Sequence, residues 1–74
     1  MKRVGPCGVL AIVVEALDEV VESGDDTSSK IAKGILETVV PLIAEACNLR
    51  EMAESSIPEN KLRKIVEKYM GDNI

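Results

Sequence analysis

Residues 9–22, with the sequence VLAIVVEALDEVVE, decide the fold of this chain. When successive residues are placed about 100° apart, as in an α-helix, the apolar side chains gather on one broad side. That side holds Val9, Val13, Ala16, Leu17, Val20 and Val21. The acids share the other side, namely Glu15, Asp18, Glu19 and Glu22. In a strand these acids would fall on both faces, so the pattern predicts a helix over residues 6–22, with Pro6 in its first turn.

The residues that follow predict a turn and a second helical region. Ser23-Gly24 ends the first helix, and we expect Gly24 to take the left-handed conformation that follows many helices. Several residues that commonly cap a helix N-terminus come next: Asp25, Asp26, Thr27 and Ser28. Apolar residues then recur at helical spacing, at Ile31, Ile35, Leu36, Val39, Leu42, Ile43, Ala46 and Leu49.

Pro41 interrupts this second region, because proline cannot donate a backbone hydrogen bond to the carbonyl of Glu37. Proline also steers Val40, the residue before it, away from helical dihedral angles. We therefore expect two helices, over residues 27–39 and 41–54, with Pro41 in the first turn of the latter. A single helix with a kink at Pro41 is the alternative.

The C-terminal third predicts one more helix. Ser56-x-x-Glu59 matches a capping box, with Pro58 inside the first turn. The expected helix covers residues 57–70 and has apolar residues on one face, at Leu62, Ile65, Val66, Tyr69 and Met70. The sequence thus predicts an all-α fold: a small bundle of three to four short helices in a single domain over residues 1–74, with flexible ends at 1–5 and 71–74.

The composition argues against catalysis. The chain has no His, which is the commonest general base and the commonest metal ligand. Asp25-Asp26 lacks the alternating oxygen ligands of a calcium-binding loop. We therefore expect a protein that is not an enzyme, with no catalytic residues, no cofactor and no metal.

The cysteines and the N-terminus suggest a compartment. Two cysteines are too few for a disulfide framework, and the apolar stretch near the N-terminus is shorter than the roughly 20 residues of a membrane span. We expect a cytoplasmic protein in which Cys7 and Cys47 are reduced, buried thiols. Antiparallel packing of the first and middle helices would bring residue 7 near residues 43–47, so a bond between the two cysteines stays open.

The first and middle helices carry more apolar surface than a small domain can hide. Their apolar sides span about half of the helix circumference, against roughly 100° for an ordinary surface helix. A domain of this size buries only about 60% of the surface that its unfolded chain exposes. We expect the remainder to contact a second copy or another protein, through Val9, Val13, Leu17 and Val20. A central helix wrapped by the others is the alternative explanation.

Charged side chains form two further candidate partner-binding strips. One is acidic and contains Glu15, Asp18, Glu19 and Glu22, and the other lies on the last helix and contains Lys61, Lys64 and Lys68. Glu19 and Glu22 sit at the negative end of their helix, where acids are unfavourable. A partner or a neighbouring helix that needs their charge would explain this placement, but a run of charge is usually a solvated face, which is the interpretation we favour.

Three functions fit these observations. The leading hypothesis is a regulator or adaptor that binds protein through an apolar helix face and forms a homodimer. The second is an acidic inhibitor, of the mobile-element or phage type, that blocks a host enzyme or the transcription machinery. The third is a nucleic-acid-binding regulator that uses the basic last helix, although a net charge of −4 argues against nucleic acid as a partner. An acidic polar side on the most hydrophobic helix argues against membrane binding.

Overall fold

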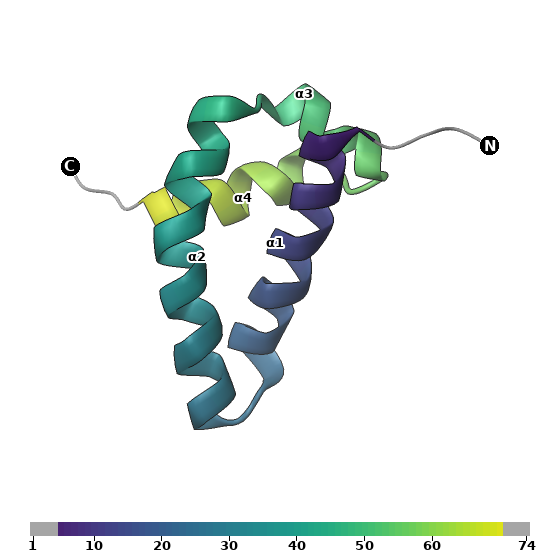
Figure 1. Ribbon diagram of the computed structural model, residues 1–74. Helices are drawn as coiled ribbons and strands as arrows, with labels where there is room; N and C mark the ends of the chain where they lie inside the picture. Colours follow the sequence, from purple (N-terminus) through teal and green to yellow (C-terminus); the bar gives the residue numbers. More distant parts are fainter. Residues whose placement is uncertain (1–4, 71–74) are drawn as a thin grey trace.

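Two antiparallel helices joined by a two-residue turn dominate the molecule (Figure 1). A computed structural model describes residues 5–70, and every regular element in that range is helical, which confirms the all-α prediction. The elements are α1 (Pro6–Ser23), α2 (Asp26–Ala46), α3 (Leu49–Met52), the 3-10 helix η1 (Ala53–Ser55) and α4 (Glu59–Met70). In Figure 1, α4 crosses behind α1 and α2. The predicted flexible ends lie outside the described residues, except for Gly5, which precedes α1.

The turn between α1 and α2 confirms one predicted cap and corrects another. Asp25 is the N-cap of α2, and its side chain accepts a hydrogen bond of 2.7 Å from the backbone N–H of Ser28. The left-handed conformation predicted for Gly24 is wrong, because its φ is −79° and its ψ is 173°. With only two residues between the helices, Gly24 is already extended and leads directly into the N-cap.

The prediction that Pro41 separates two helices is wrong, and the continuous alternative is right. Pro41 lies inside α2, which runs without interruption from Asp26 to Ala46. The buried side of the helix continues past the proline, from Leu36 and Val40 to Ile43. Glu37, whose carbonyl loses its helical donor, is exposed, so water can take the place of that donor. Packing of this side therefore outweighs the local effect of proline.

The predicted helix over 41–54 also ends earlier than expected, because a second N-terminus interrupts it. Cys47 is extended, with φ −131° and ψ 145°, and Asn48 starts the short helix α3. The side chain of Asn48 accepts from the N–H of Glu51 at 2.8 Å, and the Glu51 carboxylate accepts from the N–H of Asn48 at 3.1 Å. This capping box satisfies donors on both sides of the break.

The capping box predicted at Ser56 and Glu59 is absent, although a helix boundary does lie there. Ser56 has a φ of 78°, in the left-handed region, and follows the last residue of η1. An N-cap residue needs extended dihedral angles, so this conformation removes Ser56 from that role. α4 begins at Glu59, two residues later than predicted, and Lys61 and Leu62 donate their N–H groups to the carbonyl of Pro58.

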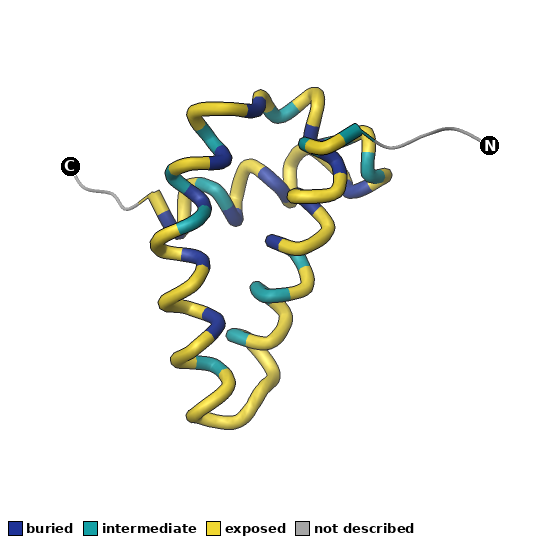
Figure 2. The backbone as a smooth tube through the Cα atoms, in the orientation of Figure 1, coloured by how far each residue is buried: buried dark blue, intermediate teal, exposed yellow. Residues whose placement is uncertain are grey.

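The core lies where α1, α2 and α4 meet, and α3 contributes to it. Its buried residues are Ala11, Val14, Leu36, Val40, Ile43, Cys47, Met52, Ile57, Leu62, Ile65 and Tyr69. In Figure 2 the buried segments of α2 and α4 lie toward one another, and the lower part of the hairpin is mostly exposed. The position of α4 therefore decides which sides of α1 and α2 are covered.

Candidate interaction surfaces

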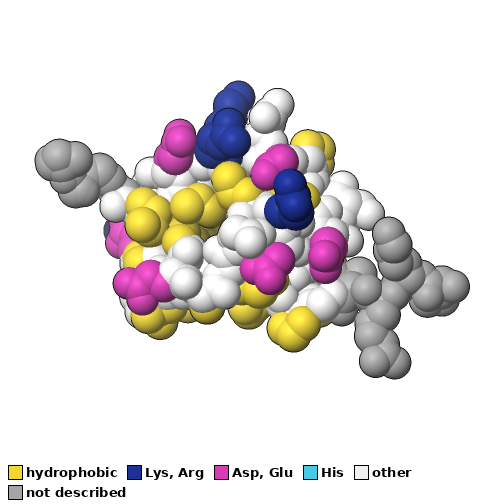
Figure 3. Space-filling model, turned by 90° about the horizontal axis from the view of Figure 1, so that it is seen from above, with side chains coloured by type: hydrophobic (Ala, Val, Ile, Leu, Met, Phe, Trp, Pro, Cys, Tyr) yellow, Lys and Arg dark blue, Asp and Glu magenta, His cyan; other side chains and the backbone are white. Residues whose placement is uncertain are grey.

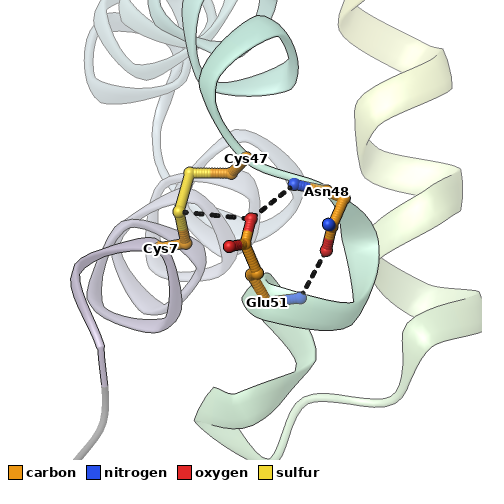
Figure 4. Close-up of a disulfide and its surroundings, with 4 residues drawn as sticks. All are labelled: Cys7, Cys47, Asn48 and Glu51. Atoms are coloured by element: carbon orange, nitrogen blue, oxygen red, sulfur yellow. Dashed lines mark hydrogen bonds between the residues drawn. A yellow bond between two sulfur atoms is a disulfide. The ribbon is translucent and has the colours of Figure 1, made fainter.

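A disulfide joins the two ends of the hairpin (Figure 4). Cys7 lies in the first turn of α1 and Cys47 follows the last turn of α2, with 5.8 Å between their Cα atoms. The two helices are antiparallel, which is the arrangement that would bring residue 7 near residues 43–47, and the expectation of two reduced thiols is wrong. Glu51 of the capping box lies beside the bond, with its Oε1 4.0 Å from the sulfur of Cys7.

The acidic strip of α1 faces α4, and lysines of the predicted basic strip neutralise most of it. Lys61 Nζ lies 2.6 Å from the Glu15 carboxylate. Lys68 Nζ lies 3.0 Å from Asp18 and 2.6 Å from Glu22. Three of the four acids are therefore paired with a neighbouring helix, which is the alternative to the solvated face that the sequence favours.

Tyr69 strengthens the same contact between α1 and α4. Its hydroxyl donates a hydrogen bond of 2.8 Å to the carboxylate of Asp18, which also accepts from Lys68. Burial of the ring, followed by this hydrogen bond, raises the pKa of Tyr69 above its usual 10.0. The hydrogen bond to Glu22 is the main reason that the pKa of Lys68 is raised. All these interactions favour the protonated tyrosine and lysine, so they hold α4 on α1 at neutral pH.

The two remaining charged residues of the predicted strips stay at the surface. Glu19 and Lys64 are exposed. Within residues 5–70 the ion pairs are those of Lys61 and Lys68, so neither Glu19 nor Lys64 takes part in one.

The predicted apolar residues of α1 divide into two groups. Val9, Val13 and Val20 are exposed, at 49%, 47% and 36%. Leu17 is half-buried and packs against the core. Nine residues, or about 180° around the helix, separate Val9 from Asp18 and Val13 from Glu22. The exposed valines therefore point away from α4, which the acids contact.

Helix α2 adds exposed apolar residues that are not among the predicted partner-binding residues. Ile31, Ile35 and Leu42 are exposed at 59%, 42% and 63%. Their signal was present in the sequence as a spacing of four and seven residues. However, the apolar side of α2 is so broad that sequence alone does not separate the inward part from the outward part.

Most of the exposed apolar residues of α1 and α2 lie on one side of the hairpin, which we call the apolar face, while Leu10 and Ile12 of α1 are exposed outside it. The apolar face consists of Val9, Val13, Ala16, Val20, Ile31, Ile35 and Leu42. In Figure 3 hydrophobic side chains lie along the lower edge of the molecule, which is the side toward the viewer in Figure 1. α4 lies on the opposite side of the hairpin, so no described element covers the apolar face.

Other kinds of site find no support among the described residues. No group of three or more His, Cys, Asp or Glu side chains between residues 5 and 70 could hold a metal ion. None of the helices in this range is both long and apolar enough to cross a membrane. In comparisons with protein families, with curated proteins and with solved structures, nothing matches this chain.

Proposed function

We propose that this chain is a non-catalytic regulator or adaptor that binds protein through the apolar face. The observation that carries the proposal is the exposure of six branched aliphatic side chains on one side of one hairpin: Val9, Val13, Val20, Ile31, Ile35 and Leu42. Soluble monomers rarely leave a contiguous apolar patch of this kind uncovered, and such patches mark interaction sites.

Burial of the apolar face can supply a large part of the free energy of binding. Complete burial of a Val, Leu or Ile side chain contributes roughly 1.5–3 kcal/mol. Covering the exposed part of the six side chains would therefore contribute roughly 4–9 kcal/mol from this chain alone. Association costs an estimated 4–15 kcal/mol, so the apolar face of this chain and a matching surface on its partner can sustain a complex.

The ion pairs favour the apolar face over the charged strips as the binding surface. An acidic inhibitor would present its carboxylates to a basic groove, but Glu15, Asp18 and Glu22 are paired with lysines of α4. The same pairs engage Lys61 and Lys68, which a nucleic-acid-binding helix would present to phosphates. An interaction through aliphatic contacts requires none of these charges.

Site-specific photocrosslinking in the native source tests this proposal. A photoreactive residue at Val13, on the apolar face, should give a crosslink to protein, whether that protein is a second copy or a different chain. The matched control carries the same residue at Met70, which is exposed at 47% at the end of α4. Equal labelling from both positions, or none from Val13, would refute the proposal.

The compartment remains a prediction, and the disulfide bears on it. The sequence predicts a cytoplasmic location, but a stable Cys7–Cys47 bond is typical of oxidising compartments. Alkylation of native protein before and after reduction, followed by mass measurement, decides between the two. Two labelled cysteines before reduction would support the cytoplasm, and none would support an oxidising compartment.

A further inference from the structure

We infer that the partner on the apolar face is a second copy of this chain, turned about a twofold axis that runs along the α1–α2 hairpin. In this arrangement α1 of each copy packs against α2 of the other, with both turns at the same end. The inference rests on the proposed function, because it names the partner for that face.

The apolar face is built in layers across the hairpin. Ser29 Oγ donates to the carbonyl of Val21 at 2.9 Å, which fixes these two positions at one level near the turn. In antiparallel helices each step back along α1 matches one step forward along α2. Counting away from the turn, four pairs of positions lie within one residue of a common level, and we call them layers: Val20 with Ile31, Ala16 with Ile35, Val13 with Thr38, and Val9 with Leu42.

Both helices space these positions by four, three and four residues, which is the spacing of apolar positions where helices pack side by side. The layers therefore present two parallel rows of side chains whose spacing matches that of a second helical pair.

The sizes of the side chains in these layers favour packing of α1 against α2 of the second copy. They do not favour packing of α1 against α1 and α2 against α2. In three of the four layers the larger side chain belongs to α2 and the smaller to α1, as with Ile35 and Ala16. In the fourth, Thr38 and Val13 have nearly equal size. A twofold axis along the hairpin places large against small in every unequal layer, which gives even packing. An axis across the hairpin would place the Ile and Leu side chains of α2 opposite one another and leave gaps beside Ala16.

Charges at the edge of the face fit the same arrangement. The apolar face itself carries no charge. About 90–110° around their helices from the middle of the face lie Glu19 on α1 and Lys30 on α2, both exposed and near the turn, while exposed Glu45 continues the α2 row beyond Leu42 at the other end. Neither Glu19 nor Lys30 forms an ion pair with another of the described residues. With α1 against α2, Glu19 lies beside Lys30 of the second copy, and the twofold axis repeats this opposite-charge pair on the other edge.

The size of the face suits a dimer of moderate affinity. α1 has 18 residues and is about 27 Å long at 1.5 Å per residue. Two helices that lie about 8–10 Å apart present a surface roughly 20 Å wide. The interface between two copies then buries on the order of 1,000 Å², which is near the lower limit for a specific complex.

Paired charge substitutions test both the partner and the axis. Ala16→Asp and Ile35→Lys each place a charge on the apolar face at a position that no described element covers, so circular dichroism should show the native helix content for both. We expect the wild type to sediment at twice its 8.0 kDa at high micromolar concentration. Each variant alone should associate at least tenfold more weakly.

An equimolar mixture of the two variants identifies the axis. In the proposed arrangement the aspartate introduced at position 16 of one copy would face the lysine introduced at position 35 of the other, and the second pair of positions would be wild type. Native mass spectrometry should therefore show a heterodimer that exceeds both homodimers by at least tenfold. Met70→Lys is a matched change outside the apolar face, and it should change the dissociation constant of the dimer by no more than about twofold.

Two results would overturn the inference. The first is a wild-type monomer throughout the concentration series, and the second is a mixture that associates no better than its components. A monomeric wild type whose Val13 position crosslinks to a different protein would refute the second copy as partner and leave the proposed function standing.

Discussion

Two glycines of the hairpin have opposite requirements for space. A Cβ on Gly24 would lie 2.6 Å from the carbonyl oxygen of Val20, which already accepts the N–H of Gly24. A Cβ on Gly34, in the middle of α2, would have no neighbour within 4 Å. Position 24 therefore needs glycine, because the backbone of Val20 approaches it closely. At position 34 glycine loses conformational entropy on folding, although nothing around it requires the absence of a side chain.

Alanine at each position should therefore shift stability in opposite directions. We expect Gly24→Ala to lower the free energy of unfolding by about 1–3 kcal/mol, because the backbone at Val20 must move. Gly34→Ala should raise it by about 0.5–1 kcal/mol through higher helix propensity. Urea unfolding of dilute protein measures both. A gain in stability for Gly24→Ala would show that the turn relaxes without strain.

Alkaline pH should weaken the attachment of α4. The pKa values of Tyr69, Lys61 and Lys68 are all raised, by burial for Tyr69 and chiefly by hydrogen bonds to Glu15 and Glu22 for the lysines. The folded protein thus holds these protons more tightly than the unfolded chain. The stabilisation is complete below the unfolded pKa values, near 10, and is lost as pH rises through the folded ones. The urea midpoint should be constant from about pH 8 to about pH 9 and should fall above about pH 10.

Tyr69 supplies its own readout for this prediction, because it is the only aromatic residue of the chain. Ultraviolet absorbance should show its ionisation above the usual pH range and in step with the loss of helix. Tyr69→Phe should keep the part of the alkaline transition that comes from the lysines. An ordinary tyrosine titration in the folded protein would mean that neither the burial of the ring nor the hydrogen bond to Asp18 persists in solution.

The disulfide acts at the level of whole elements, because it joins α1 to α2 at the end opposite their turn. It closes a loop with a sequence separation of 40 residues. Such a constraint lowers the entropy of the unfolded chain and contributes about 2–4 kcal/mol in the usual range. We expect the double variant Cys7→Ser, Cys47→Ser to lose that amount in urea unfolding and to keep its helix content. Wild type treated with a reductant should match the variant, and unchanged stability after reduction would contradict the prediction.

The helices were predictable wherever one local signal acted alone. The pattern of residues 9–22 gave α1 to within one residue of its end, and Asp25 capped α2 as its residue type indicates. Prediction failed where local signals competed with packing. At Pro41 the buried row of Leu36, Val40 and Ile43 kept the helix continuous. At Ser56 the left-handed φ ended η1, although Ser56-x-x-Glu59 matches the capping-box pattern as well as Asn48-x-x-Glu51 does.

The charged part of the candidate site was only half predictable. The spacing of Glu15, Asp18 and Glu22 on one side of α1 follows from helix geometry alone. Their pairing with Lys61 and Lys68 is a contact across 46–50 residues of chain, which depends on where α4 packs. No local pattern contains that information. The same applies to the disulfide. The sequence predicted that Cys7 and Cys47 could lie near one another, but it did not predict that they are close enough to bond.

At the scale of the whole molecule, one asymmetry governs the surface. α4 covers one side of the hairpin and no described element covers the other. Composition predicted an excess of apolar surface, and nine large hydrophobic residues are exposed among those described. Sequence could not tell which of them faces outward, because a helix whose apolar side spans half its circumference fits several orientations. The exposed apolar surface therefore depends on how the helices pack together, and it cannot be read from any single helix.

This exposed side should make thermal stability depend on protein concentration. If two folded chains associate through the apolar face, mass action stabilises the folded state as concentration rises. At protein concentrations above the dissociation constant of the dimer, each tenfold increase in concentration should raise the free energy of unfolding by about 0.7 kcal/mol per chain. This corresponds to roughly 3–6 °C in the melting temperature of a domain of this size. Scanning calorimetry over a hundredfold concentration range measures the shift. Ala16→Asp should melt at a temperature that depends less on concentration over the same range, since its folded chains associate at least tenfold more weakly. A wild-type melting temperature that is equally constant would mean that the apolar face stays uncovered in the isolated protein.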